Sequence, residues 1–323
     1  MTDRSVLIRV PATVGNFGGA AGCAALALDA ALNVRASTRR DGNVGLRYFG
    51  ENGERVPRDA SNLAVRAMQA ALDFKGLPFG GVDLEMYGSA PVGVGLGSST
   101  AAVWAGLLAA DRLFRLGLGE KILFDLAGTL DSRSDNLRAA WSGGFVARFE
   151  ESASPVFRAT VVPDDLELHV VIPEVGTIRA RETGTENSSP RDRTAFLNRA
   201  RTLSGLLAQA GRSEAPQLEE TVTGIAEKTV PGLDEALRVR TAGMQAVFAC
   251  GSGPAIGILA KSEDAEGATT AVMDCLAGHG VASRSTLFRA TNTGARDWNA
   301  RGTEIRLAPP VGLDMPELPS LPV

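Results

Sequence analysis

The residues best suited to chemistry lie in the run APVGVGLGSSTAA at positions 90–102, where three glycines alternate and two serines follow. Glycine lets the backbone approach a ligand closely and adopt positive φ without strain. The apolar, Ala-rich segment after Ser98 has a helix-forming composition, so the glycines end where a helix begins. A helix N-terminus offers free N–H groups and partial positive charge, both of which favour phosphate. The run therefore predicts a phosphate cradle, with hydroxyls placed to hold phosphate oxygens or Mg²⁺.

This loop differs from two common nucleotide-binding loops. No lysine follows its last glycine, as a Walker A loop requires. Its G-x-G-x-G spacing, outside a clear βαβ unit, fits the dinucleotide-binding fingerprint poorly. Taken alone, the loop leaves one alternative open, which is a glycine-rich turn that only caps a buried helix.

Composition excludes several classes of function. The chain has 323 residues, which predicts one large or two medium domains, and its net charge of −4 and 5% aromatic content give no basis for nucleic-acid binding. It has no apolar run of membrane-spanning length and no signal-peptide layout. Three scattered cysteines and two histidines do not support a zinc site or a Ser-His-Asp triad. We expect a cytoplasmic protein that acts on small molecules, with no nucleic-acid or membrane partner.

The elements that must position the loop are strands and helices in mixed order. Hydrophobic periodicity predicts helices over 59–74, from 98 onward, and over 121–130, 191–210, 217–228, 233–240 and 264–279. It predicts strands over 5–10, 82–87, 143–149, 156–162, 166–172, 246–250, 255–260 and 283–290, with β character and a turn over 35–49. Residues 11–22 are expected to form a loop, and residues 23–35 leave helix and strand open. Asp59 or Ser61 is the expected N-cap of the helix that ends at Phe74.

Five motifs, in order along the chain, resemble the GHMP kinase superfamily, and within it the homoserine kinases. The glycine run resembles the superfamily's phosphate loop, and Cys250–Pro254 resembles its C-terminal glycine motif. RVPAT at residues 9–13, with Asn16 and Gly18, resembles the superfamily's N-terminal motif. The homoserine kinase likeness lies in the opening over residues 9–22, in Asn62-Leu63, and in Asp135-Asn136 followed by Gly143-Gly144. The resemblance extends over nearly the whole chain, to about residue 305.

The resemblance implies an α+β, two-domain GHMP kinase fold. An N-terminal ribosomal-S5-like domain would span residues 1–163 and a C-terminal ferredoxin-like domain residues 164–308, with a Pro-rich tail over 309–323. It implies an ATP-dependent kinase that uses Mg²⁺ to phosphorylate a hydroxyl of an amino acid or related metabolite. The partner would be a small-molecule substrate, and a homodimer is compatible with the sequence.

The resemblance also implies roles for individual residues. Asn62 would lie near the adenine, and the phosphates would contact Pro91, Gly93, Gly95, Leu96, Gly97, Ser98, Ser99 and Thr100. Ser98 and Asp131 would hold Mg²⁺, although a strict alignment leaves Thr129 as the alternative to Asp131. Asn136 would orient the hydroxyl, Arg181 or Arg133 would offset charge, and Asp135 would act as a base or as a structural cap. The acceptor would contact Asn16, Gly22, Arg181, Gly251, Ser252 and Gly253.

Two departures leave the acceptor open. Gly22 stands where the homoserine kinases have an acidic residue for the substrate amine. Ala226, beside Glu227 and Lys228, stands where they have an arginine for the carboxylate. Because a buried charge without a partner is penalised, these changes predict an acceptor other than homoserine unless neighbouring groups restore the contacts. The alternatives are a GHMP kinase for a non-amino-acid alcohol and a nucleotide-binding homologue without kinase activity.

Overall fold

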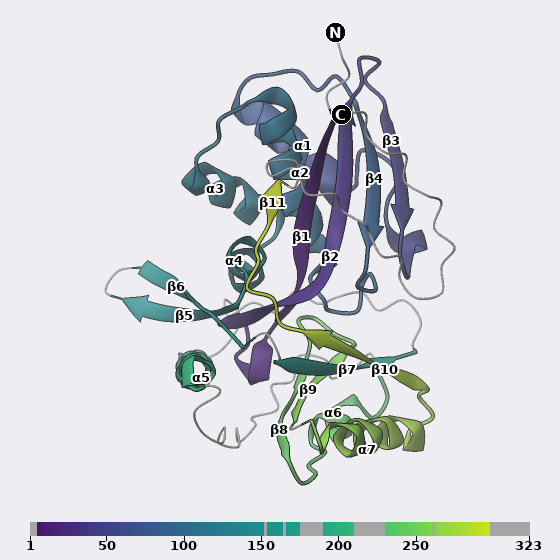
Figure 1. The fold of residues 1–323 in the computed structure, drawn as a ribbon, viewed down its shortest axis with the longest axis vertical. Helices are drawn as coiled ribbons and strands as arrows, with labels where there is room; N and C mark the ends of the chain where they lie inside the picture. The colour runs from purple at the N-terminus through teal and green to yellow at the C-terminus, as the bar shows by residue number, and fades with distance from the viewer. Residues whose placement is uncertain are drawn as a thin grey trace.

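The computed structural model describes residues 5–151, 154–163, 166–174, 190–209, 230–260 and 262–297. They form two sheets with helices packed against them (Figure 1). The larger sheet has seven strands, and its central order is β11-β1-β2-β4-β3. Its strands are β1 (Ser5–Gly15), β2 (Ala24–Thr38), β3 (Val44–Phe49), β4 (Val82–Gly88), β5 (Phe145–Glu151), β6 (Ser154–Thr160) and β11 (Arg296–Asp297).

The second sheet has four strands in the order β10-β7-β9-β8. These are β7 (Glu167–Pro173), β8 (Met244–Ala249), β9 (Ile256–Ala260) and β10 (Ser283–Arg289). Two helices, α6 (Leu233–Leu237) and α7 (Ala265–Gly278), cover the face that is turned away from the larger sheet (Figure 1). Every pairing in this sheet is antiparallel.

Four helices accompany the larger sheet. They are α1 (Leu63–Phe74), α2 (Ser98–Phe114), α3 (Glu120–Leu130) and α4 (Ser134–Ser142). Of these, α2 and α4 contact its strands, and α1 and α3 pack on the other helices. The central helix α2 lies against β1, β2 and α1, and 13 of its residues are buried. Its nearly continuous apolar surface fits a helix enclosed on most sides. This enclosure fixes the N-terminal end of α2, where the glycine loop meets the helix.

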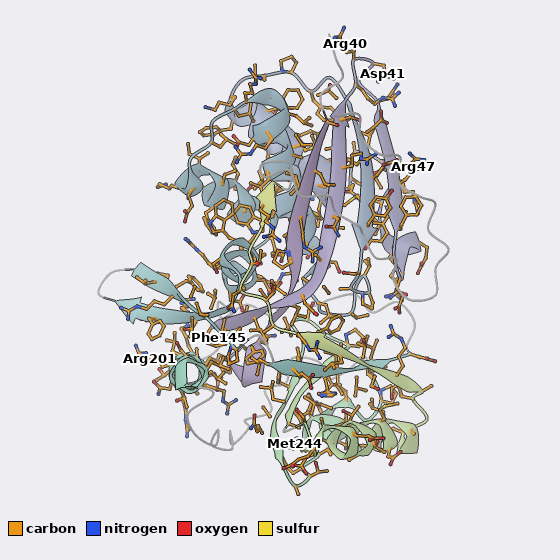
Figure 2. All side chains as sticks on the ribbon, viewed as in Figure 1. Arg40, Asp41, Arg47, Phe145, Arg201 and Met244 are labelled. Carbon is orange, nitrogen blue, oxygen red and sulfur yellow. The ribbon has the colours of Figure 1, made fainter. Side chains whose placement is uncertain are left out.

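The two sheets share a hydrophobic core. Phe17, in the short 3₁₀ helix η1 (Phe17–Gly19), packs against Phe145 of β5 and Phe248 of β8, with ring centroids 5.6 and 5.1 Å apart. Phe145 lies where the sheets meet (Figure 2). The long helix α5 (Pro190–Gln209) lies beside β5, and β11 returns the chain to pair with β1. The domain division at residue 163 stays a prediction.

Most predicted elements are confirmed, but the first 75 residues require corrections. Strand β1 continues to Gly15 through the segment predicted as loop, and its register shifts between Pro11 and Thr13, which accommodates the proline. Residues 24–38 form a strand; their alternation is hidden because both faces are buried. Helix α1 begins later than predicted, because Asn62 rather than Asp59 or Ser61 caps it.

Two further points concern elements that the sequence did not place. Helix α4 was not predicted, because its nine residues bury only a short apolar stripe. The predicted helix over 217–228 and the Pro-rich tail lie outside the described residues. Among the residues that are described, no helix is long and apolar enough to cross a membrane.

The crossing of α1 and α2 depends on Gly106, and this yields a stability prediction. A Cβ at Gly106 would lie 2.1 Å from the carbonyl oxygen of Ala64, so Gly106→Ala must separate the two helices. We expect it to lower the free energy of unfolding by about 2–3 kcal/mol, as overpacking does. The control Gly128→Ala lies in α3 with open space around the added methyl, and should raise stability by up to ~1 kcal/mol. Urea unfolding of the two variants decides; equal effects would contradict the close crossing.

Candidate active site

The glycine loop is clamped between β1 and the turn that follows β8. The backbone N–H of Thr13 donates to the carbonyl of Leu96 at 3.3 Å, and that of Ala255 donates to the carbonyl of Val94 at 3.1 Å. A Cβ at Gly95 would lie 2.0 Å from the carbonyl oxygen of Cys250, and one at Gly97 would lie 2.2 Å from Thr13 Oγ1. Both glycines have positive φ, 99° and 72°. These positions require glycine because of both space and backbone conformation.

The N-terminal and C-terminal motifs meet at Asn16. Its Nδ2 donates to the carbonyl of Gly251 at 2.6 Å, and its Oδ1 accepts from the N–H of Gly22 at 3.0 Å. The N–H of Gly251 in turn donates to the carbonyl of Gly15 at 3.0 Å. Asn16 is buried, and both ends of its amide are engaged within the protein. It braces the turn, and its predicted contact with the acceptor stays a prediction.

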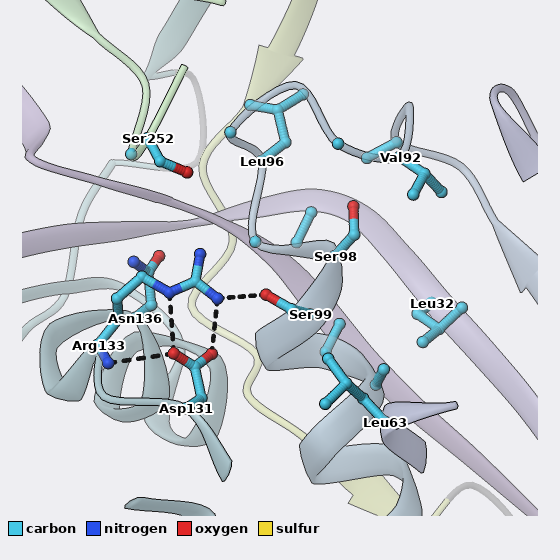
Figure 3. Close-up of a pocket in the computed structure, with 18 of the residues that line it drawn as sticks. Leu32, Leu63, Val92, Leu96, Ser98, Ser99, Asp131, Arg133, Asn136 and Ser252 are labelled. Carbon is cyan, nitrogen blue, oxygen red and sulfur yellow. Dashed lines mark hydrogen bonds and ion pairs between the residues drawn. The ribbon is translucent and has the colours of Figure 1, made fainter. Parts of the chain in front are cut away.

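A cavity of about 820 Å³ opens beside the loop (Figure 3). Most of the predicted site residues line it: Asn16, Gly22, Asn62, Gly93, Gly95, Leu96, Gly97, Ser98, Ser99, Asp131, Asp135, Asn136, Gly251 and Ser252. Three predicted contacts, Pro91, Thr100 and Gly253, are not in its lining. Arg181, Ala226, Glu227 and Lys228 lie outside the described residues.

The cavity has an apolar end and a polar end. Figure 3 shows Leu32 and Leu63 at one end and Asp131, Arg133 and Asn136 at the other, and the lining also includes the side chains of Tyr48, Val56, Met86 and Asp135. Asn62 lies in the lining but serves the backbone, because its Oδ1 accepts from the N–H of Ala64 and its Nδ2 donates to the carbonyl of Pro57, both at 2.9 Å. Its predicted place near the adenine stays a prediction.

Asp131 is held in a network of hydrogen bonds at the polar end. Its Oδ1 accepts from Arg133 Nε at 2.8 Å and from the Arg133 backbone N–H at 3.1 Å. Its Oδ2 accepts from Arg133 Nη2 at 2.9 Å and from Thr100 Oγ1 at 2.6 Å. Thr129, the alternative in the alignment, is exposed and donates to the carbonyl of Leu126 at 2.7 Å. The geometry therefore places Asp131, and not Thr129, in the cavity.

The residues predicted to hold Mg²⁺ do not present an open ligand set. A carboxylate has about four lone-pair sites, and Asp131 already accepts four hydrogen bonds. Ser98 Oγ is directed to the carbonyl of Pro91 at 3.5 Å and makes no bond to Asp131. Among the described residues no cluster of three or more His, Cys, Asp or Glu side chains could hold a metal. Asp131 does not fit an inner-sphere metal ligand in this arrangement.

Asp135 and Asn136, in the first turn of α4, line the cavity and are almost completely buried. Asp135 Oδ1 accepts from the N–H of Asn136 at 2.9 Å. Asp135 Oδ2 and Asn136 Oδ1 are buried and have no hydrogen-bond partner of normal geometry in the described part of the chain. Burial raises the pKa of Asp135 to about 6 and the charge of Asp131 adds to that shift, whereas the backbone N–H groups of Asn136 and Asn16 and the charge of Arg133 oppose it. Buried polar atoms are rarely left without a partner, so this pair beside the cavity is a candidate for a functional role.

Comparison with known proteins agrees with these motifs. The family model described as the GHMP kinases N terminal domain matches residues 62–144. A homoserine kinase from Streptomyces avermitilis is 30% identical over 273 residues, which cover 81% of this chain and 88% of the relative. A homoserine kinase from Desulfitobacterium hafniense is 28% identical over 301 residues, covering 90% and 99%. The crystal structure of homoserine kinase from Cytophaga hutchinsonii superposes with a TM-score of 0.67 at 22% identity, covering 92% and 98%.

The relative that is 30% identical over most of both chains decides the family. The chain belongs to the GHMP kinases. It has the two-domain α+β fold of that family, and it is a phosphotransferase that acts on a hydroxyl group of a small molecule. GHMP kinases use ATP, which agrees with the phosphate cradle predicted from the glycine run.

Two arginines in the lining of this GHMP kinase cavity lie outside the motifs. Arg148 projects from β5 and Arg193 from α5, and both line the cavity. They come from elements 45 positions apart that the shared core brings together, so no sequence spacing relates them. An arginine in the cavity fits an anionic group on a ligand.

The raised pKa of Asp135 predicts how stability depends on pH. The pKa of Asp135 is about 6 in the folded kinase and about 3.8 in the unfolded chain, so the folded state keeps the proton between these values and wild-type stability falls as pH rises through that window. Asp135→Asn cannot ionise and escapes this loss, which amounts to about 3 kcal/mol. The difference in unfolding free energy between variant and wild type should therefore grow from pH 4 to 6 and then level off.

Urea unfolding across this pH range measures that difference. Asp125→Asn, at an exposed carboxylate of α3, is the control for a surface charge. A gap between Asp135→Asn and wild type that stays constant from pH 4 to 7 would contradict the burial of an ionisable Asp135.

Proposed function

We propose that this GHMP kinase transfers the γ-phosphoryl group of ATP to a hydroxyl of an amino acid or related metabolite. The observation that carries the proposal is a single cavity shared by two features. The glycine loop and the first turn of α2 line one part of it, and Asp135 and Asn136 line another. A donor and an acceptor bound there would be held together, which is most of what phosphoryl transfer needs.

The donor would enter as Mg²⁺-ATP with its triphosphate on the loop. Backbone N–H groups at Gly97–Ser99 begin α2 and carry the positive end of its dipole. The adenine would occupy the apolar end, between Leu63 at the start of α1 and the strand residues Leu32 and Met86. Ser98 and Ser99 would donate hydroxyls to phosphate oxygens.

The acceptor hydroxyl would bind at Asp135. Asp135 lines the cavity, and its buried Oδ2 has no hydrogen-bond partner of normal geometry among the described residues. A pKa of about 6 leaves the carboxylate ionised at neutral pH but basic enough to take a proton. As the hydroxyl oxygen attacks the γ-phosphorus, the bond to the β–γ bridging oxygen breaks and ADP leaves. The hydroxyl proton passes to Asp135 Oδ2, while Asn136 orients the hydroxyl.

The charges around the cavity favour an acceptor less cationic than homoserine. Of the described residues that line the cavity, Asp131 and Asp135 are the acids, and Asp131 is saturated by Arg133 and Thr100. Asp135 is needed at the acceptor hydroxyl, and Gly22 has no side chain to supply a second carboxylate for a substrate ammonium. Arg148, which also pairs with Glu150 at 3.3 Å, and Arg193 add positive charge to the lining, and this charge favours an acceptor that carries an anion.

A second candidate is a GHMP kinase for an alcohol that is not an amino acid. The specific observation in its favour is Gly22, which lines the cavity without a side chain where the homoserine kinases carry an acid. The space and lost charge suit a neutral alcohol group. Both candidates share the donor site, so only the acceptor distinguishes them.

A matched acceptor series tests the proposal through ADP release and mass detection of the product. L-homoserine carries both charged groups, 4-hydroxybutanoate only the carboxylate, 3-aminopropan-1-ol only the amine, and propan-1-ol neither. We expect 4-hydroxybutanoate to equal or exceed homoserine in kcat/KM and the amine-only compound to lose at least ~10-fold, because an unpaired ammonium is penalised.

A variant at the phosphate loop separates this enzyme from contaminating ATPases. Ser98→Ala should lower turnover at least ~10-fold and leave the Kd for ADP within ~3-fold, since the lost contact matters most in the transition state. Activity on propan-1-ol alone would favour the second candidate. If no phosphoryl group is transferred to any of these compounds, to other hydroxy amino acids or to sugars, the kinase proposal is overturned. A preference for homoserine of ~100-fold in kcat/KM would overturn the acceptor argument.

A further inference from the structure

We propose that Arg133 binds the γ-phosphoryl group of the nucleotide, and that Asp131 positions Arg133 instead of ligating the metal. This inference rests on the proposed ATP site. It assigns a catalytic residue and a positioning residue from contacts that lie entirely within the described residues.

Asp131 holds the guanidinium of Arg133 in a fixed orientation. Arg133 Nε and Nη2 donate to the two carboxylate oxygens at 2.8 and 2.9 Å, a bidentate fork that fixes the plane and direction of the guanidinium. The Asp131 side chain is 3% exposed, and that of Arg133 is 29% exposed. Thr100, fully buried in α2, anchors the carboxylate from behind at 2.6 Å. The acid is thus a fixed support, and the partly exposed cation faces the cavity.

Arg133 keeps two N–H donors that its contacts with Asp131 and Ser99 do not use. A guanidinium carries five N–H groups, and Arg133 uses Nε toward Asp131 and Nη2 toward Asp131 and Ser99 Oγ. Nη1 makes no hydrogen bond in the described part of the chain, and Figure 3 shows it pointing away from Asp131 into the cavity, on the side of Ser252 and Leu96. Two donors on a fixed cation therefore remain for a ligand.

The guanidinium of Arg133 lies beside the first turn of α2. Ser99 belongs to the first turn of α2, so its hydrogen bond to Arg133 places the guanidinium at the helix N-terminus that holds the phosphates. Phosphate oxygens pair with guanidinium in a bidentate manner, and an arginine on the transferred group stabilises charge in phosphoryl transfer. A cation at this point completes the positive surround formed by the loop N–H groups.

The hydrogen bonds of Asp131 conflict with its alternative role as a Mg²⁺ ligand. Inner-sphere Mg²⁺ needs a carboxylate oxygen at about 2.1 Å in octahedral geometry. Both oxygens of Asp131 already accept two hydrogen bonds each, and one donor is a permanently charged guanidinium. A metal there would have to displace Arg133 and would lie against its charge. Asp131 thus cannot ligate a metal while it also holds Arg133 in place for a phosphate.

The first test compares a non-hydrolysable triphosphate, AMPPNP, with ADP by calorimetry in the full-length protein without acceptor. If Arg133 contacts the γ-phosphoryl group, Arg133→Gln weakens AMPPNP at least ~10-fold and ADP by no more than ~3-fold. Arg133→Lys keeps the charge and recovers part of the AMPPNP affinity. Asp131→Asn shows the same selective loss, and the double variant is no worse than Arg133→Gln, because the two residues act as a unit.

The second test measures Mn²⁺ affinity of the ADP complex by electron paramagnetic resonance. Asp131→Asn leaves that affinity within ~3-fold if Asp131 is a positioning residue, whereas loss of an inner-sphere carboxylate weakens it by ~10-fold or more. Arg138→Ala, on the exposed side of α4, and Asp125→Asn are matched controls that leave both readouts unchanged. Circular dichroism confirms that each variant is folded.

The outcomes separate this inference from the proposed function. Equal losses of AMPPNP and ADP in Arg133→Gln and Arg133→Lys, or weakened Mn²⁺ binding in Asp131→Asn, would overturn the roles assigned here while leaving an ATP-dependent kinase intact. If wild type binds neither nucleotide, the proposed function fails and this inference fails with it. Selective loss of AMPPNP with unchanged Mn²⁺ affinity supports it, whichever acceptor the enzyme uses.

Discussion

The close backbone contact between Gly95 and the carbonyl oxygen of Cys250 is the constraint on which the site depends. It brings the loop before α2 within reach of the turn after β8, two segments separated by more than 150 residues in sequence. Hydrogen bonds from Thr13 to Leu96 and from Ala255 to Val94 hold the loop on both sides. Side chains would separate these backbones, so the small size of glycine is what gives the phosphate cradle its shape.

That contact needs the two sheets to be packed together, and the aromatic cluster of Phe17, Phe145 and Phe248 supplies the packing. The same arrangement brings Arg148 and Arg193 to the cavity that α4 and the glycine loop enclose. Charge at the polar end is then divided between two acids. Asp131 is neutralised within the protein by Arg133, whereas Asp135 is buried, with no partner of normal geometry for Oδ2 among the described residues and a pKa raised toward neutrality. The two carboxylates therefore differ in function because their surroundings differ.

The sequence was most informative where backbone geometry restricts residue type. Gly95 and Gly97 could be recognised because a close approach and positive φ require glycine, and α2 because its apolar run is long. Residues 24–38 could not be assigned, because burial on both faces removes the period-2 pattern of a strand. The salt bridge between Asp131 and Arg133 also escaped, since a motif gives residue types near a site but not the hydrogen bonds that occupy them.

The most direct test of the clamped loop compares Gly95→Ala with Gly93→Ala by ADP affinity. Both glycines have positive φ, but an added methyl meets the Cys250 carbonyl at 2.0 Å in the first and only the Arg55 side chain, at 3.3 Å, in the second. The account predicts that Gly95→Ala raises the Kd for ADP at least ~10-fold, while Gly93→Ala, which costs backbone strain alone, stays within ~3-fold. Equal effects of the two substitutions, or unchanged affinity in Gly95→Ala, would contradict it.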